Sequence, residues 1–416
     1  MRRFVPWVLI IALSIGLLGA PLNAAAVKAG SKCNKAGATS VYKGLKFTCT
    51  KSGKKLMWSK GVKVSISAPK PTSNSDRTPP KPDPTMVPNP PAFIPAPTSP
   101  EIEKLDLLVA NALKSGKAVN AEVDFQVGPG KEVAILAEIA KDSLETALLI
   151  AGILGIDFSK PVKAYIGTRE WLTPKMPAGS WCADPVIGVP GLGSGGFCGL
   201  DNGVIFVSID GFKNEVGSGP RNFTQNPDKI LVSFSFVHEM VHWMQGEATV
   251  KYAKMKGFYN SYWLNEGGAN FGAMMAQAYL YKVPFSKIRT YIATYGNCLG
   301  VSQVLKIKDY ITNSGQSNNC GPYYSGYLWT EFLIAKTGDL SALLNLAKQG
   351  EKFDREVTWN PDKLEAYNEQ RLALSLKYQY GIEYEDFVTE AEKYGVLASI
   401  ALADWSRANP NYWPAD

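Results

Sequence analysis

The segment FVHEMVHWMQ, from Phe236 to Gln245, contains both histidines of this 416-residue chain. His238 and His242 are four residues apart, and Glu239 directly follows the first of them. A helix with 3.6 residues per turn would bring both imidazoles to one face, where they can reach a single metal ion. The alternative interpretation is two ordinary polar residues on the flank of a helix.

The residues around this segment predict such a helix. Apolar residues recur at spacings of three and four, which is typical of a helix face in contact with a core: Ile230, Phe234, Val237, Val241 and Met244. Asn226 and Pro227 suit the start of the helix, and Gly246 suits its end. Glu239 lies about 100° around the helix from His238. It would therefore reach a metal-bound water instead of the metal, as a general base must.

A catalytic zinc ion needs a third protein ligand and an open position for water. Because the chain has no third histidine, this ligand must be a carboxylate or a cysteine. The best candidate is Glu266 in YWLNEGGANFGAMMAQAYL, which predicts a second helix with an apolar face of Phe271, Met274, Met275 and Tyr279. Its residues 267–269 are small and would allow close packing against the first helix. The alternative role for Glu266 is a carboxylate that stabilises a helix start.

Together these residues resemble a known family. The pattern H-E-x-x-H followed by W-L-x-E-G-x-A is similar to that of the gluzincin zinc metallopeptidases, and the chain is closest to their bacterial peptidase MA-like group. The resemblance extends from about residue 101 to about residue 350. It implies a zincin-like catalytic domain with one zinc ion per chain, held by His238, His242 and Glu266, and Glu239 as general base.

The resemblance also implies further site residues. The family often has an aspartate that orients the first histidine where this chain has Asn270, whose carbonyl could accept the same N–H. In GPYYSGYLW, the Y-x-x-G spacing selects Tyr323 to stabilise the oxyanion, with Tyr324 as the alternative. A peptide substrate would bind along GVIFVSI, residues 203–209, as an added strand.

The expected function is zinc-dependent hydrolysis of peptide bonds in a peptide or protein substrate. Two alternatives remain: a non-catalytic zinc-containing binding module at the cell surface, and a zinc hydrolase of a non-peptide bond. The net charge of +7 is modest for 416 residues, and no nucleic-acid-binding signature is present.

The chain predicts four regions. Residues 1–26 have the charged start, apolar run and A-x-A site of a cleaved signal peptide, which implies a secreted or cell-surface protein. The alternative is an uncleaved membrane anchor. Residues 27–63 form a small lysine-rich β module, whose lysines either face solvent or attract anionic cell-wall polymers or a membrane surface. Residues 64–100 are a proline-rich linker, and residues 101–416 are the metallopeptidase domain.

The domain is expected to be α+β, with a small mixed sheet and the active-site helix first and a mainly helical C-terminal part. A helix is predicted in residues 132–155, and strands are predicted in residues 161–167 and 203–209. Residues 180–199 are interpreted as a glycine-rich loop. In an exported chain, the six cysteines favour disulfides. Pairing between neighbours in the sequence is the simplest choice: Cys33–Cys49, Cys182–Cys198 and Cys298–Cys320.

Overall fold

The computed structural model describes residues 30–32, 39–42, 45–53, 55–60, 62–63, 98–184, 195–198, 203–215, 229–253, 261–295, 306–307, 321–344 and 364–408. The chain divides into two compact units, Met1–Pro88 and Asn89–Asp416. The predicted signal peptide and residues 64–97 of the predicted linker lie outside the described residues.

The smaller unit contains a four-stranded antiparallel sheet. Its strands are β1 (Thr39–Tyr42), β2 (Leu45–Ser52), β3 (Lys55–Trp58) and β4 (Val62–Lys63), and β2 pairs with each of the others. Gly53 lies in the turn between β2 and β3 with φ of 61°, a conformation that favours glycine. The predicted β character of this module is therefore confirmed.

One predicted disulfide of this unit lies partly outside the described residues. Cys49 is buried and disulfide-bonded, whereas Cys33, its predicted partner, is not described. The lysines whose burial is described here are all exposed: Lys32, Lys51, Lys55 and Lys60.

The larger unit contains a second four-stranded sheet, in the order β5 (Val123–Val127), β6 (Val162–Gly167), β8 (Val204–Ser208) and β7 (Gly195–Cys198). The first three strands are parallel, and β7 is antiparallel to β8. The predicted strands β6 and β8 are confirmed, as is the predicted helix, which is α2 (Lys131–Ile153) and connects β5 to β6.

The interpretation of residues 180–199 as a loop is wrong in part, because residues 195–198 form β7. Two glycines obscure the strand pattern, and pairing with β8 decides the conformation. The predicted disulfide Cys182–Cys198 is confirmed, with the two Cα atoms 5.8 Å apart. It ties β7 to the short helical turn at Trp181–Ala183. Cys298 and Cys320 lie outside the described residues.

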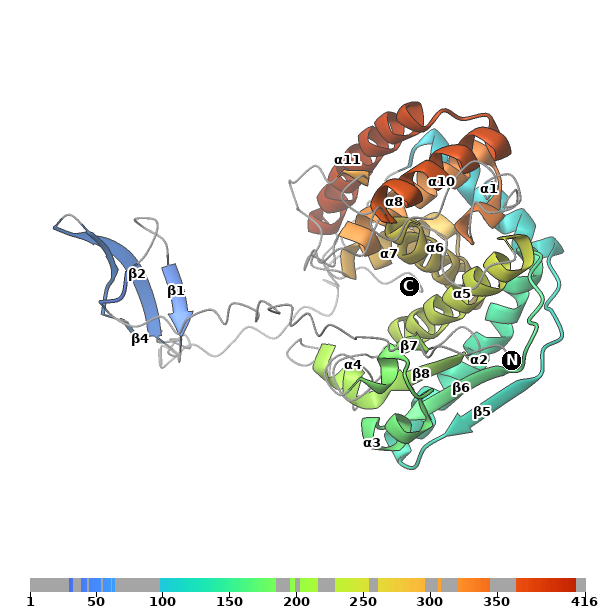
Figure 1. The fold of residues 1–416 in the computed structure, drawn as a ribbon, viewed down its shortest axis with the longest axis horizontal. Coiled ribbons are helices and arrows are strands. Elements are labelled where there is room, and N and C mark those ends of the chain that lie inside the picture. Colours follow the sequence, from blue (N-terminus) through green and yellow to red (C-terminus); the bar gives the residue numbers. More distant parts are fainter. Residues whose placement is uncertain are drawn as a thin grey trace, which may run out of the picture. The chain divides into compact units, whose positions relative to one another are not determined.

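Helices make up most of the rest of the described chain, as the sequence predicts. After the sheet, α5 (Lys229–Ala253) lies over β7 and β8, and α6 (Tyr262–Tyr281) packs on α5 and α8 (Gly326–Thr337) (Figure 1). The helices are α1 (Pro100–Ser115), α3 (Arg169–Leu172), α4 (Ile209–Glu215), α5 (Lys229–Ala253), α6 (Tyr262–Tyr281), α7 (Phe285–Tyr295), α8 (Gly326–Thr337), α10 (Leu364–Tyr380) and α11 (Tyr384–Ala408), with the π-helical turn η4 (Gly321–Ser325) and short 3₁₀ turns at Thr173–Lys175 and Leu340–Leu343.

Two details of the helix prediction are wrong. The helix that carries the histidines does not end at Gly246 but continues to Ala253, because the following turn contributes buried residues such as Ala248 to the core. Burial of that turn outweighs the cost of about 1 kcal/mol for a glycine inside a helix. Tyr279 is 47% exposed, whereas Phe271, Met274 and Met275 are buried.

The small residues of α6 allow close approach to several neighbours, not only to α5. A Cβ atom on Gly267 would lie 2.2 Å from the backbone of Gly326 in α8, and one on Gly268 would lie 2.3 Å from the carbonyl oxygen of Leu343. Gly272 faces α5, where a Cβ atom would lie 2.6 Å from Val241. The packing of α6 therefore depends on glycine on three sides.

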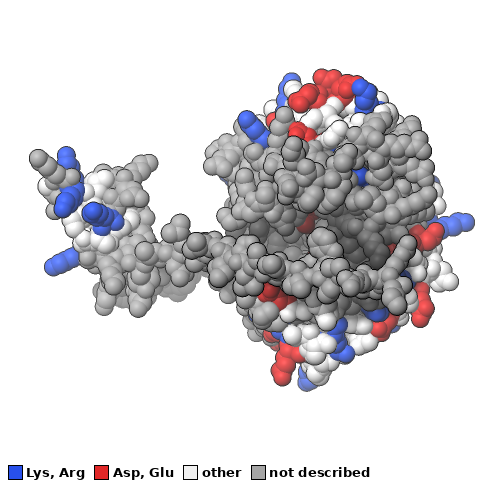
Figure 2. All heavy atoms as spheres, in the orientation of Figure 1, with Lys and Arg blue, Asp and Glu red and all other residues white. Residues whose placement is uncertain are grey.

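Charged residues of the larger unit do not segregate by sign on the face in Figure 2, where described acidic and basic side chains are interspersed. Within the described part of the chain, no helix combines the length and the apolar character needed to cross a membrane.

We predict that Gly267→Ala destabilises the protein by about 1–3 kcal/mol, because the added methyl group overlaps backbone atoms that cannot move aside alone. Chemical denaturation measures this change. Gly195→Ala is the control, since its Cβ atom would meet its nearest neighbours at an ordinary 3.5 Å. Equal stability of the two variants would contradict the packing described for α6.

Candidate metal centre

Three side chains from two adjacent helices form the candidate site. His238 and His242 lie on α5, and Glu266 lies on α6. His238 and Glu266 are 6% and 8% exposed, so the cluster is largely shielded from water. Among the described residues, this is the only group of three or more His, Cys, Asp or Glu side chains positioned to hold a metal ion.

The three candidate ligand atoms form a compact triangle. Nε2 of His238 lies 3.1 Å from Nε2 of His242. Oε2 of Glu266 lies 3.3 Å from the first nitrogen and 3.4 Å from the second. The sequence predicts these three residues as the ligand set, and the fold brings all three together.

A buried glutamine fixes the orientation of His242. Nδ1 of His242 lies 2.8 Å from Oε1 of Gln245. The amide group of Gln245 donates to the carbonyl oxygens of Asn265 and Leu343, at 3.0 and 3.1 Å, so its oxygen must face the histidine. Nδ1 of His242 is therefore the proton donor, and its Nε2 carries the lone pair.

Asn270 fixes His238 in the same way. Nδ1 of His238 lies 2.8 Å from Oδ1 of Asn270, and Nδ2 of Asn270 donates to the carbonyl oxygen of Tyr323 at 2.6 Å. The amide thus orients the histidine and also holds the η4 turn. An aspartate here could accept from His238, but it could not donate to Tyr323.

This arrangement suits a metal ion. Two nitrogen atoms and a carboxylate oxygen converge within 3.4 Å, and because each Nδ1 atom donates to an amide oxygen, the neutral form of each histidine directs its Nε2 lone pair into the triangle. Oε2 of Glu266 is buried and makes no hydrogen bond within the described structure. Buried acceptors in this arrangement repel one another unless a cation lies between them. The cluster could therefore hold a metal ion.

The pKa values of His242 and Glu266 also show that the cluster favours a bound positive charge. Burial disfavours the imidazolium form of His242, but the Glu266 carboxylate outweighs burial and raises the pKa of His242 to about 9. Burial alone would raise the pKa of Glu266, but attraction to His242 and contacts with both histidines hold it well below its usual value. A proton or a metal ion can supply the required charge.

Glu239 lies beside the cluster and is not part of it. The backbone N–H of Phe197 in β7 hydrogen-bonds its carboxylate, which fixes the side chain between α5 and the sheet. Burial raises the pKa of Glu239 above its usual value, and the nearby histidines offset only part of that rise. A carboxylate with a raised pKa and a fixed position suits proton transfer.

Tyr323 lies against the cluster, whereas Tyr324 does not contact it. The ring of Tyr323 stacks on that of His238, with centroids 5.9 Å apart and planes at 23°. The hydroxyl group of Tyr324 donates to Ser399 in α11 instead, at 3.4 Å. Of the two tyrosines that the sequence leaves open, Tyr323 is therefore the one at the site.

Sequence reasoning missed Tyr262, Gln245 and the N–H of Phe197. The hydroxyl groups of Tyr262 and Tyr323 hydrogen-bond each other, close enough to Glu266 for its charge to raise the pKa of both after burial. Tyr262 precedes Glu266 by four residues and Gln245 follows His242 by three, so helical spacing could have suggested both. The contact from Phe197 depends on β7, which the sequence did not predict.

The strand predicted to receive a substrate is not at the edge of the sheet. Residues 204–208 form β8, which pairs with β6 on one side and β7 on the other. Its backbone groups are therefore already used, and it cannot accept another strand. The strand beside Glu239 is β7.

Comparison of the chain with protein-family models, curated proteins and solved structures finds no match. The geometry of the site is therefore the basis for inferring a function.

We predict one bound metal ion per chain. His238→Ala, His242→Ala and Glu266→Ala should each lose it, because each removes one of three converging ligand atoms. Elemental analysis of the purified protein measures this. Glu247→Gln, which changes another α5 carboxylate that contacts Trp243 and Ser159, should keep the metal. Full metal content in all three ligand variants would contradict the site.

Removal of the metal should lower the melting temperature, because an ion that binds only the folded chain stabilises it. This stabilisation reaches about 4 kcal/mol at a free metal concentration about 1,000 times Kd. A strong chelator should therefore destabilise the wild type and leave His238→Ala unaffected.

We also predict that Asn270→Ala weakens metal binding by about 10–100-fold, because His238 loses the acceptor that fixes its tautomer. Asn270→Asp should restore the affinity, since the carboxylate accepts the same N–H. Competition with a chromophoric chelator measures both affinities. Wild-type affinity in Asn270→Ala would show that the hydrogen bond does not position the ligand.

Proposed function

We propose that the chain is an exported zinc-dependent peptidase of the gluzincin type, with a zincin-like catalytic domain in residues 101–416. The observation that carries this proposal is the triangle of His238, His242 and Glu266 with Glu239 fixed beside it by Phe197. A purely structural metal site has no use for a separate buried carboxylate one residue after a ligand. Peptide-bond hydrolysis requires such a base.

The donor set and its dimensions favour zinc. Two imidazole nitrogens and one carboxylate oxygen are a ligand set of catalytic zinc, whereas magnesium and calcium prefer oxygen ligands. Ligand atoms around a tetrahedral zinc ion, at bonds of about 2.0–2.1 Å, lie about 3.3–3.4 Å apart. The cluster has separations of 3.1, 3.3 and 3.4 Å.

In this mechanism, zinc would polarise the scissile carbonyl group and make a water molecule more acidic. Glu239 takes a proton from the attacking water and later passes it to the amine that leaves. Tyr323, whose phenol is held beside Glu266 and Tyr262, donates a hydrogen bond to the negative charge that develops on the carbonyl oxygen. The products are a carboxylic acid and an amine.

The proposed substrate is an extended peptide or protein segment that pairs with β7. Among the described residues, β7 pairs with a strand only on its β8 side. Gly195, the residue at its start, lies next to the base, since a Cβ atom there would be in van der Waals contact with Cγ of Glu239 at 3.5 Å. Addition of a strand at a sheet edge is a common mode of peptide recognition.

Two other features support an extracellular role. The disulfide Cys182–Cys198 is typical of proteins that fold in an oxidising compartment. In the smaller unit, the exposed lysines Lys32, Lys51, Lys55 and Lys60 support attraction to an anionic cell-wall polymer.

We predict that Glu239→Gln separates catalysis from metal binding. Glutamine keeps the size of the side chain but cannot accept a proton, so hydrolysis should fall by about 10²–10⁴-fold while the metal content stays unchanged. Digestion of a peptide library, with products identified by mass spectrometry, measures the activity. Glu247→Gln on the same helix is the matched control and should cleave like the wild type.

The outcomes distinguish the competing functions. Equal cleavage by Glu239→Gln and the wild type would rule out this mechanism. If the wild type holds zinc and cleaves esters but no peptide, the chain is a zinc hydrolase of a non-peptide bond. If it holds zinc and cleaves neither, it is a binding module.

A further inference from the structure

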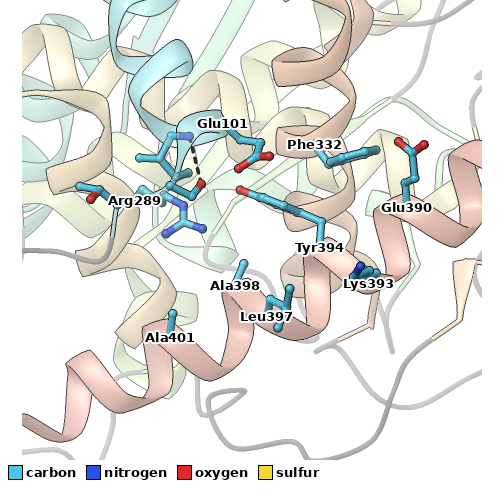
Figure 3. A pocket seen from close by; sticks show the side chains of 12 residues that line it. Glu101, Arg289, Phe332, Glu390, Lys393, Tyr394, Leu397, Ala398 and Ala401 are labelled. Carbon is cyan, nitrogen blue, oxygen red and sulfur yellow. Dashed lines mark hydrogen bonds between the residues drawn. The ribbon is translucent and has the colours of Figure 1, made fainter.

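A cavity separate from the metal cluster lies among four helices of the larger unit. It has a volume of about 410 Å³, within the usual range for small-molecule sites. Its walls come from the start of α1 and from α7, α8 and α11 (Figure 3). None of the residues that line it belongs to the metal cluster.

The cavity is mainly apolar but contains one buried cation. Apolar side chains from α1, α8 and α11 form most of the wall: Ile102, Phe332, Leu397, Ala398 and Ala401. Arg289 of α7 also lines the cavity, although only 2% of its surface is exposed. In Figure 3 its guanidinium group points toward the space between Tyr394 and Ala398.

Only part of the guanidinium group is paired. Nε and Nη2 of Arg289 donate to the two carboxylate oxygens of Glu331, at 2.5 and 2.8 Å. The hydroxyl groups of Tyr327 and Tyr394 donate to the same carboxylate, which is completely buried. The remaining nitrogen, Nη1, makes no hydrogen bond within the described part of the chain. Because Arg289 lines the cavity, the N–H groups of Nη1 are available to an acceptor bound there.

The charges around the cavity indicate what it can accept. The pair of Arg289 and Glu331 is already neutral, and the lining also contains Glu101, Glu390 and Lys393. Glu390 forms an ion pair with Lys336. Glu101 and Lys393 balance each other in charge, so an anion on Nη1 would leave the cavity with a net negative charge, which is unfavourable in a largely apolar cavity. A neutral oxygen acceptor would satisfy Nη1 without this cost.

We propose that this pocket binds a neutral, largely apolar small molecule whose carbonyl or hydroxyl oxygen accepts a hydrogen bond from Nη1 of Arg289. The ion pair alone could serve only to join α7 to α8. That role explains two of the three guanidinium nitrogens and leaves both the cavity and the third nitrogen without a purpose. A bound molecule with one acceptor group would fill the cavity and pair with the third nitrogen, while the ion pair still joins α7 to α8.

The experiment uses the full chain and two fluorescent probes of similar size. Prodan is a neutral naphthyl ketone with an apolar body and one carbonyl acceptor, and anilinonaphthalene sulfonate is an anion. We expect saturable binding of prodan, with a blue shift in its emission, and weaker binding of the anion. Ala401→Phe fills the pocket and should weaken prodan binding by about tenfold or more. Ile400→Phe is the matched control, since Ile400 is 55% exposed and does not line the pocket.

Arg289→Lys tests the polar contact. Lysine can still neutralise Glu331, but it has no nitrogen that corresponds to Nη1 of Arg289. Prodan should therefore bind about tenfold more weakly. Thermal melting establishes that each variant is folded. If Arg289→Lys does not fold, Ala401→Phe still tests the proposal.

Four results would overturn the proposal. The first is no binding of prodan to the wild type up to its solubility limit. The second is equal binding of prodan to the wild type and to Ala401→Phe. The third is tighter binding of the anion than of prodan. The fourth is unchanged prodan binding in a folded Arg289→Lys variant. Because the readout is binding and not hydrolysis, none of these results depends on the proposed peptidase activity.

Discussion

The close approach of α5 and α6 is the constraint on which the rest of the site depends. Two histidines on one helix supply only two ligand atoms, and the third must come from a different segment of the chain. Oε2 of Glu266 reaches 3.3 and 3.4 Å from the histidine nitrogens because α6 packs directly on α5. At Gly272, a single methyl group would lie 2.6 Å from Val241. Because protein cores are close-packed, such an overlap would separate the helices and enlarge the triangle of ligand atoms.

Two buried amides then convert this contact into a defined set of lone pairs. Gln245 ties α5 to the backbone at the start of α6 and to Leu343, and Asn270 ties α6 to the η4 turn. Each amide uses its N–H groups on backbone carbonyls, so its oxygen can only accept from a histidine. The tautomers of His238 and His242 are therefore determined by hydrogen bonds that reach residues about 50 to 100 positions away in the sequence. An imidazole without such a partner could turn its N–H toward the metal and lose its value as a ligand.

The predictable part of the structure is the part that local spacing determines. His238, Glu239 and His242 lie within five residues, so helical geometry alone relates them. Glu266 could be predicted from the residues around it, and α2, β6 and β8 from their apolar patterns. The strand β7 could not, because two glycines give it no pattern and its pairing with β8 is a long-range contact. Tyr279 illustrates a second limit. The helix α6 is buried on most of its surface, so apolar residues occur all around it and periodicity does not identify the face that remains exposed.

The η4 turn links the metal cluster to the pocket lined by Arg289, but its contacts restrict movement from one to the other. Tyr323 and Tyr324 are adjacent, yet the first stacks on His238 and the second donates to Ser399 on α11, the helix that forms one wall of the pocket. A ligand in the pocket can shift the metal cluster only if the η4 turn has two positions and the ligand binds the protein more tightly when the turn is in one of them. Asn270 opposes such movement, because it holds the Tyr323 carbonyl at 2.6 Å from the α6 side. The buried pair of Arg289 and Glu331 fixes α8, which continues directly from the turn, against α7. With the turn held from both directions, an occupant of the pocket would add stability to the helical part of the unit and leave the positions of the metal ligands unchanged.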